Sequence, residues 1–202
     1  MKVLSPFGPK IAQLKLNKSL INKINKEVDR ISSQKKLTKK YDYSKKLVGQ
    51  VKQEIQLPKN FIKKYLAKKI NQSIKEFIKS TTGKTTKTIK IKNFWVVSQF
   101  SHEYNPVHYH DGHVSGVGYL KIPKFTTNKK SLTTNGTIDF INGNKMFLNN
   151  SIFNHNPRVG DVILFPNYLM HTAYPFTSKG ERRSFSFNAE IDNSIANVFK
   201  NE

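Results

Sequence analysis

Residues 107–122 read VHYHDGHVSGVGYLKI, which places three histidines directly before a strand candidate, Val114–Ile122. Comparable candidates of alternating or apolar character lie on both sides of it: Thr86–Val97, Thr137–Ile141, Lys145–Leu148, Asp161–Phe165 and Arg183–Ile191. The dipeptide Asn142-Gly143 between two of them predicts a tight hairpin. Short strands joined by turns rich in Gly, Asn and Pro predict a mainly β chain that folds as an antiparallel sandwich or small barrel.

The N-terminal part of the chain is predicted to be mostly helical. Apolar residues between 20 and 31 follow one helical face, with Asn17 or Ser19 as the N-cap. Pro58 opens a second, longer candidate that ends before Gly83. We therefore expect a basic helical region over residues 1–85 that buttresses a β domain over residues 86–202.

Composition excludes several classes of protein. The chain has 202 residues and no cysteine, so disulfide scaffolds, Cys-ligated zinc and thiol nucleophiles are ruled out. No run approaches the roughly 18 apolar residues that a membrane span needs. The first six residues lack the apolar segment of a secretory signal. These features predict a cytoplasmic protein with no membrane partner.

The charge of the chain is concentrated in its first half. The formal net charge is +22, and residues 1–90 hold 24 Lys or Arg against 5 Asp or Glu, a net of +19. Such asymmetry can mark a nucleic-acid-binding arm. However, phosphate recognition often uses the arginine fork, and residues 1–90 contain only Arg30. A solvated lysine surface is therefore favoured, and nucleic-acid binding stays the alternative.

Two of the histidines have the spacing of metal ligands. His108 and His110 point the same way if they lie in one strand, so both imidazoles could reach one ion. His171 follows a turn, an apolar strand and a proline-led loop, which makes it the candidate for a distant third ligand. A single histidine near a strand is more often a surface or hydrogen-bonded residue, and His102, His113 and His155 are assigned to that class.

A second pattern lies eleven residues beyond His171. In the alternating stretch from Arg182 to Asn188, Arg182 shares a strand face with Ser184, and Arg183 shares the other face with Phe185. A guanidinium with a hydroxyl two residues further on can bind a carboxylate. The plain alternative is an edge strand with ordinary surface charges.

Together these motifs resemble the Fe(II)- and 2-oxoglutarate-dependent oxygenases. The resemblance looks closest to a family of bacterial and phage 2OG-Fe(II) oxygenases with four motifs in order: His-x-His, Ser-Gly-Val-x-Tyr, Phe-Pro-x-x-x-x-His and Arg-x-Ser-x-Ser-Phe-Asn. Their counterparts in this chain are His108-Tyr109-His110, Ser115–Tyr119, Phe165–His171 and Arg182–Asn188. The resemblance covers roughly residues 93–190 and leaves residues 1–90 unmatched.

The resemblance implies a double-stranded β-helix, which is a jelly-roll, cupin-like barrel with iron inside its mouth. It implies a dioxygenase or hydroxylase that uses Fe(II) and 2-oxoglutarate and releases succinate and CO2. His108 and His171 would be metal ligands and catalytic residues, and Arg182 with Ser184 would bind the distal carboxylate of 2-oxoglutarate. Tyr119 would line the same pocket. A phage-encoded enzyme acting in a bacterial cytoplasm is compatible with it.

One position departs from the pattern of the wider superfamily, which has a carboxylate where this chain has His110. The third ligand could be His110, Asp111 or a water molecule. Asp111 points to the opposite face of a regular strand, so His110 is the favoured ligand.

Two other functions remain open. A cupin-type metalloenzyme without 2-oxoglutarate would use the same barrel, although no Glu lies three or four residues after His110, where the cupin motif has one. A non-enzymatic nucleic-acid-binding module is the other. The sequence leaves protein side chains, nucleotides and small metabolites open as substrates, and it does not predict the oligomeric state.

Overall fold

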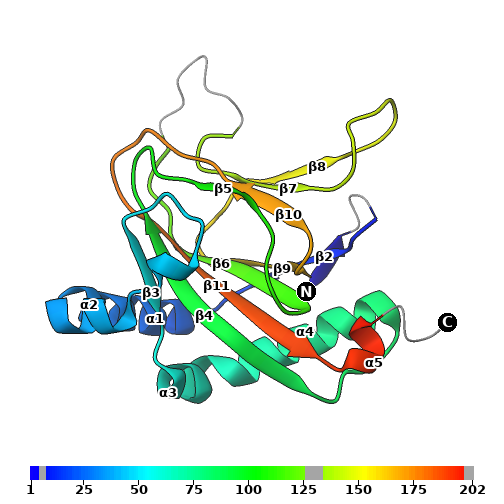
Figure 1. Cartoon of the computed structure of the whole chain (residues 1–202), viewed down its shortest axis with the longest axis horizontal. Helices are drawn as coiled ribbons and strands as arrows, with labels where there is room; N and C mark the ends of the chain where they lie inside the picture. Colours follow the sequence, from blue (N-terminus) through cyan, green and yellow to red (C-terminus); the bar gives the residue numbers. More distant parts are fainter. Residues whose placement is uncertain (5–7, 126–133, 198–202) are drawn as a thin grey trace.

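The computed structural model describes residues 1–4, 8–125 and 134–197. Within these ranges the strands form two antiparallel sheets (Figure 1). The larger sheet has the order β1-β2-β9-β6-β11-β4-β3, and the smaller one has the order β5-β10-β7-β8. The strands are β1 (Lys2–Leu4), β2 (Ile11–Lys15), β3 (Gln53–Gln56), β4 (Ile89–Gln99), β5 (Asn105–His108), β6 (Val114–Lys121), β7 (Ile138–Ile141), β8 (Ile152–His155), β9 (Asp161–Pro166), β10 (Met170–Ala173) and β11 (Arg182–Ile191).

The two sheets face one another and enclose an apolar core. Buried side chains from both sheets meet there, including Val117 and Ile163 from the larger sheet and Phe140 from the smaller one. Two facing antiparallel sheets closed in this way form the double-stranded β-helix that the sequence predicts. The predicted fold class is confirmed.

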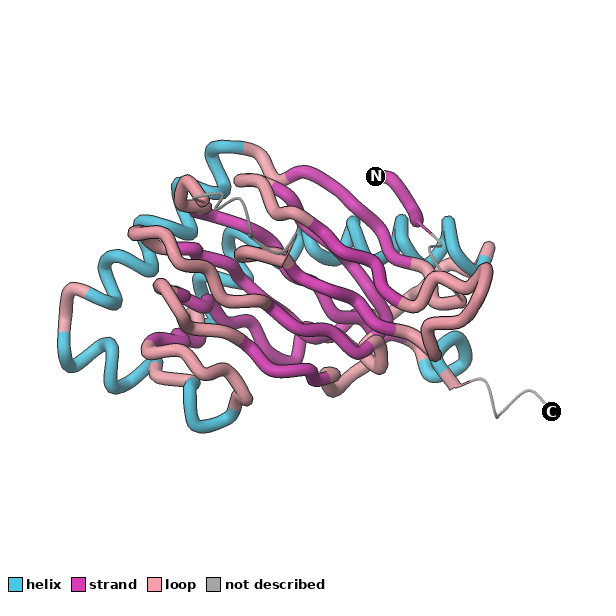
Figure 2. Tube along the Cα trace, turned by 90° about the horizontal axis from the view of Figure 1, so that it is seen from above, coloured by secondary structure: helices cyan, strands magenta, loops and turns pink. Residues whose placement is uncertain are grey.

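The two long helices pack on the outer face of the larger sheet (Figure 1). Figure 2 shows the strands crossing the middle of the molecule, with helical segments behind them and at one end. The helical segments are α1 (Lys18–Ser32), α2 (Lys35–Tyr41), η1 (Ser44–Lys46), α3 (Lys59–Phe61), the π-helical η2 (Ile62–Leu66), α4 (Ala67–Thr82) and α5 (Asn193–Ala196). Within the described ranges, no helix is long and apolar enough to cross a membrane.

Both long helices have the ends that the sequence predicts. The side chain of Asn17 accepts a hydrogen bond of 2.8 Å from the backbone N–H of Leu20 and caps α1. Gly83 adopts a left-handed conformation with φ of 72° and ends α4. The apolar faces of both helices join a buried cluster with the outer side chains of the larger sheet.

The N-terminal region differs from the prediction in its strands. Besides the helices it supplies β1, β2 and β3, and these occupy both edges of the larger sheet. β2 pairs with β9, and β3 pairs with β4. Both strands are short and do not show a clear alternation of apolar residues, so their pairing depends on neighbours that are distant in sequence. The proposed domain boundary at residue 86 stays a prediction.

The hairpin after β7 also differs from the prediction. Lys145–Leu148 is not a strand: Phe147 and Leu148 are 92% and 91% exposed, and residues 142–151 form a loop. The strand that returns to β7 is β8, which begins at Ile152. Because the Asn-Gly signal marks only where a chain turns, it did not define the length of this loop.

β11 organises the larger sheet because it lies between β6 and β4 and pairs with both. Its side chains alternate between two environments. Phe185 and Phe187 pack with the helices on the outer face, and the rings of Phe94 and Phe185 stack with centroids 5.2 Å apart. The alternate residues, from Arg182 to Asn188, face the space between the sheets.

We predict that Gly118→Ala destabilises the fold by about 1–3 kcal/mol, the usual cost of overpacking a core. A Cβ at Gly118 would lie 2.2 Å from Cζ of Phe185, whose ring is held by Phe94. Urea unfolding followed by circular dichroism measures the change. Gly8→Ala is the control, since its nearest neighbouring atom lies 4.0 Å away. Equal stability of the two variants would contradict the packing described.

Candidate active site

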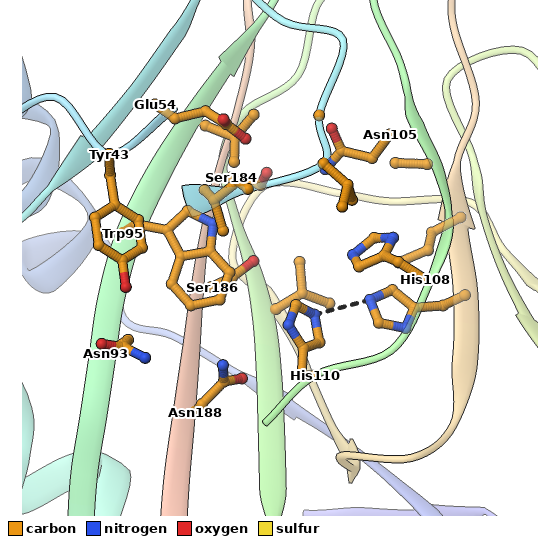
Figure 3. A pocket seen from close by; sticks show the side chains of 18 of the residues that line it. Tyr43, Glu54, Asn93, Trp95, Asn105, His108, His110, Ser184, Ser186 and Asn188 are labelled. Carbon is orange, nitrogen blue, oxygen red and sulfur yellow. Dashed lines mark hydrogen bonds between the residues drawn. The ribbon is translucent and has the colours of Figure 1, made fainter. Parts of the chain in front are cut away.

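A cavity of about 220 Å³ lies between the two sheets, and Figure 3 shows the side chains around it. One wall comes from β3, β4 and β11, and the opposite wall comes from β5 and β10. The segment 43–50 covers one end. The backbone N–H of Tyr43 donates a hydrogen bond to the Glu54 carbonyl and holds this segment to the larger sheet. The backbone N–H of Gln50 donates to the Tyr104 carbonyl and holds it to the residue before β5.

The three predicted ligand residues come together in this cavity. His108 and His171 are opposite each other in the pair β5–β10. His110 lies just beyond the end of β5, so the assumed continuous strand is not what aligns it with His108. Its ring nevertheless reaches the site, and its Nε2 lies 3.0 Å from Nε2 of His171. The potential ligand atoms of all three imidazoles lie within 4.8 Å of one another.

Backbone carbonyls orient two of these rings. Nδ1 of His108 lies 2.7 Å from the Pro106 carbonyl oxygen, and Nδ1 of His171 lies 2.9 Å from that of Leu169. An imidazole that donates from Nδ1 presents a lone pair at Nε2, which is the usual preparation of a metal ligand. Both Nε2 atoms are therefore available to the cavity.

Burial favours the neutral form of all three imidazoles. Burial is the main cause of a lowered pKa in each case. The pKa of His108 is lowered, that of His110 is lowered to about 3, and that of His171 lies well below its usual value. The neighbouring imidazoles lower the pKa values of His110 and His171 further. Neutral imidazole is the form that binds a metal.

The geometry of the cluster fits one divalent ion. Two nitrogens that each lie about 2.1 Å from an ion, at a right angle, are about 3.0 Å apart. This is the separation between Nε2 of His110 and Nε2 of His171. Asp111, the alternative ligand, is placed differently. Its carboxylate lies 2.6 Å from the Lys92 ammonium, and its side chain is 72% exposed.

Arg182 is a buried cation without an anionic partner among the residues that the structure describes. It is 2% exposed, and within the described ranges its Nε and Nη1 have no hydrogen-bond partner. Burial also lowers the pKa of Arg182 from its usual value. Its guanidinium carbon lies 5.4 Å from the ring centroid of Tyr119 on β6. A desolvated and unpaired guanidinium at a cavity is a receptor that requires an anion.

The adjacent Arg183 has the opposite environment. It points to the outer face of the sheet, where its guanidinium lies 2.8 Å from Asp29 on α1 and 2.6 Å from Glu181. The alternation predicted for this strand is therefore observed, with Arg182 and Ser184 facing the cavity. Arg183 is as buried as Arg182, but its charge is neutralised within the chain.

Tyr119 is buried beside Arg182, although it is not among the residues that line the cavity. Its ring is 1% exposed, and within the described residues its hydroxyl has no hydrogen-bond partner. Burial raises the pKa of Tyr119 to about 12, so the phenol stays protonated and can donate a hydrogen bond. Ser184 is the register partner of Tyr119 across the pair β11–β6. Arg182, Ser184 and Tyr119 are thus clustered on neighbouring strands, as donors for one anion would be.

Comparison with known proteins agrees with this geometry. Residues 93–188 match the family model described as "Putative 2OG-Fe(II) oxygenase". This part of the chain belongs to the 2OG-Fe(II) oxygenase family. The match spans β4 to β11 and contains the three histidines, Tyr119, Arg182 and Ser184. No curated protein matches the sequence.

Solved oxygenases share the fold. The viral collagen prolyl hydroxylase vCPH from Paramecium Bursaria Chlorella virus-1, in its 2OG complex, is 15% identical with a TM-score of 0.56, covering 89% of this chain and 94% of that one. A prolyl hydroxylase from Trichoplax adhaerens, in complex with a hypoxia inducible factor peptide fragment, is 12% identical with a TM-score of 0.60, covering 94% and 86%. HygX from Streptomyces hygroscopicus, with iron bound, is 11% identical with a TM-score of 0.57, covering 89% and 81%. At these identities the similarity supports the barrel fold.

The remaining histidines of the oxygenase lie outside the cluster. Nδ1 of His113 accepts a hydrogen bond of 3.0 Å from the backbone N–H of Ile191. His155 lies 3.3 Å from the carboxylate of Asp161, and His102 is exposed in a turn. Assigning these three histidines to structural or surface roles agrees with their positions.

Several lining residues were not singled out from the sequence. Asn93 and Trp95 on β4 and Asn188 on β11 face the cavity, and the two-residue alternation of their strands could have indicated them. Glu54 on β3 gave no comparable signal, because β3 itself was not predicted. Glu54 is 2% exposed, and its Oε2 has no hydrogen-bond partner among the described residues. Burial, and then the nearby charge of Asp42, raise the pKa of Glu54 from 4.5 to about 7.

We predict that Glu54→Gln stabilises the oxygenase much more at pH 8 than at pH 5. The unfolded carboxyl loses its proton near pH 4.5, whereas the folded one keeps it until about pH 7. The stability of the wild type should therefore fall as the pH rises through this window. The difference between variant and wild type should reach at most about 3 kcal/mol at pH 8. Urea unfolding at both pH values measures it, and a variant less stable at both would contradict an unpaired carboxylate.

Proposed function

We propose that this Fe(II)- and 2-oxoglutarate-dependent oxygenase holds its iron through His108, His110 and His171. Support comes from the convergence of the three neutral imidazoles and from their carbonyl-oriented rings. His110 takes the place that a carboxylate has in the usual facial triad. Asp111 is the weaker candidate, because its carboxylate is already engaged by Lys92.

The cosubstrate is proposed to lie with its distal carboxylate against Arg182. The unpaired guanidinium, which lines the same cavity as the imidazole cluster, is the observation that carries this proposal. Arg182 would supply two parallel donors, and the hydroxyls of Ser184 and Tyr119 lie on the neighbouring positions of the sheet. A lysine would offer a point charge in place of a planar fork.

The chain positions the metal-binding side chains and excludes water from the cavity. Iron and 2-oxoglutarate, when bound, supply the oxidising chemistry, with release of succinate and CO2. Phe165 and Phe140 pack against the ring of His171, with centroids 4.9 and 5.8 Å away, and hold that ring in place. His171 itself is 4% exposed, and His108 and His110 are partly buried, so the cluster is largely screened from solvent.

The rival functions lack a comparable observation. A cupin-type enzyme would leave the buried charge of Arg182 without a role. A nucleic-acid-binding module would leave the imidazole cluster unexplained. Binding of nucleic acid to the lysine-rich surface stays the alternative that is not favoured, and a cytoplasmic location stays a prediction. The similar structures include prolyl hydroxylases, one with a peptide fragment, so a protein side chain is one candidate substrate and a small molecule another.

We predict that His108→Ala and His171→Ala each weaken binding of one divalent ion by at least about 100-fold. Loss of a residue that only hydrogen-bonds to a metal ligand costs up to about 100-fold, and loss of a ligand itself should cost no less. His110→Ala should also weaken binding, whereas Asp111→Ala should not. Anaerobic calorimetry with Fe(II), or calorimetry with Mn(II), measures these affinities. Loss of binding in Asp111→Ala with retention in His110→Ala would assign the third ligand to Asp111.

We predict that Arg182→Ala weakens 2-oxoglutarate binding by about 100-fold or more, as expected when one partner of a buried ion pair is removed. Arg182→Lys keeps the charge but lacks the planar fork, so it should also weaken binding. Arg183→Lys is the matched control, because Arg183 is equally buried but points to the helices. Titration of the Mn(II)-loaded protein with 2-oxoglutarate measures the effect. If the wild type binds no 2-oxoglutarate at millimolar concentration, the cupin alternative replaces the oxygenase.

A further inference from the structure

Among the described residues, the cavity has a buried acidic group and a buried basic group with unpaired atoms, and they lie on different strands of one sheet. Arg182 lies on β11 beside Tyr119 of β6, and Glu54 lies on β3 at the edge of the larger sheet. Tyr119, Ser184, Val97 and Glu54 are successive register partners across β6, β11, β4 and β3. At about 4.8 Å per strand, Glu54 is about 10 Å from Ser184. We therefore expect Arg182 and Glu54 to contact different parts of the molecules that bind in this cavity.

Glu54 shares its end of the cavity with a second unpaired acceptor. Glu54 and Asn105 lie near one another in Figure 3, away from His110. Among the described residues, Oε2 of Glu54 and Oδ1 of Asn105 are buried without a hydrogen-bond partner. Both side chains border Gly49: a Cβ built there would lie 2.5 Å from Oδ1 of Asn105 and 2.7 Å from Oε1 of Glu54. Two acceptors that converge on one point require a ligand with several donors.

The ligand that best satisfies this pair is a cation. A buried carboxylate without a partner is costly, which is the reason that the pKa of Glu54 is raised. Asp42 adds a second negative charge nearby and increases that cost. An ammonium or a guanidinium supplies both the positive charge and the donors that Glu54 and Asn105 lack.

Aromatic rings extend the same end of the cavity. Tyr43 and Trp95 line it with ring centroids 6.0 Å apart. Aromatic faces attract cations, and the chain already shows this at Tyr43, where the Lys46 ammonium lies 5.4 Å from the ring centroid. A cationic group with an aliphatic stem would therefore find acceptors at its head and rings along its length.

We propose that the substrate of this oxygenase carries an ammonium or guanidinium group, which binds between Glu54 and Asn105 beside Gly49. The proposal rests on the proposed function, since it assigns the substrate end of the same cavity. Asn105 lies three residues before His108 on β5, about 10 Å along the strand. The carbon that is oxidised is therefore several bonds from the cationic group, as in the side chain of lysine or arginine or in an alkylamine.

The test measures binding without turnover. N-acetyl-L-lysine amide, N-acetyl-L-arginine amide and butylammonium are titrated into the protein loaded with Mn(II) and 2-oxoglutarate, with N-acetyl-norleucine amide as the uncharged control. Calorimetry or ligand-detected NMR gives the affinities. The wild type should bind at least one cationic probe and bind the norleucine probe at least about 30-fold more weakly. The preferred probe shows whether the group is an ammonium or a guanidinium and whether an amino-acid backbone is needed.

Two variants examine the site itself. Glu54→Gln should weaken binding of the cationic probe by at least about 30-fold. Gly49→Ala should do the same, because its methyl group would occupy the space between the two acceptors. Both should bind 2-oxoglutarate as the wild type does. Glu76→Gln makes the same chemical change on α4, away from the lining of this cavity, and should leave probe binding unchanged.

The outcomes separate this proposal from the proposed function. Failure of all cationic probes at 10 mM in a wild type that binds 2-oxoglutarate would overturn the cation site alone. Unchanged probe binding in Glu54→Gln would also overturn the cation site. The same holds if this variant loses probe binding, 2-oxoglutarate binding and thermal stability together, because Glu54 would then be a structural residue. A wild type that binds a cationic probe but no 2-oxoglutarate would retain the cation site and overturn the oxygenase mechanism.

Discussion

The two-residue alternation of β11 is the constraint on which the rest of the molecule depends. The strand is paired on both sides, so its side chains can only point to the helices or into the barrel. Phe185 and Phe187 on one face hold the helices, and Arg182 and Ser184 on the other face the cavity. A shift of one residue would bury the phenylalanines in the cavity and remove Arg182 and Ser184 from it. Packing and function are thus fixed by the same register.

The adjacent arginines show how environment separates two chemically identical groups. Both are almost fully buried, in a chain that otherwise uses lysine for most of its positive charge. Arg183 is neutralised by Asp29 and Glu181 and joins α1 to the sheet. Arg182 lies beside the ring of Tyr119, and among the described residues its Nε and Nη1 have no hydrogen-bond partner, which is a cost that the fold carries. Such a cost is expected where a ligand supplies the missing partner.

The barrel and its central motif could be predicted because their signals are local. Strand alternation gives the two faces of β11, and motif spacing gives the three histidines. Glu54 could not be predicted, because it lies on β3, a four-residue strand whose pairing with β4 depends on the folded sheet. The loop after Gly143 was misjudged for a related reason: Phe147 and Leu148 are apolar and suit a strand, yet they have no sheet to pair with and are exposed. Local patterns therefore indicate the proposed iron site and leave the substrate end open.

The proposed arrangement would also keep the two small molecules in their own places. 2-Oxoglutarate is a dianion, so Glu54 and the nearby Asp42 repel it from the substrate end. A cationic substrate is repelled in turn by Arg182, whose charge is unneutralised until the cosubstrate is bound. Inside a cavity of low dielectric such like-charge encounters are costly, so discrimination comes from repulsion as much as from attraction. Each molecule would then approach the imidazole cluster from one side only, and a cosubstrate already seated on Arg182 would remove the repulsion that a cationic substrate meets.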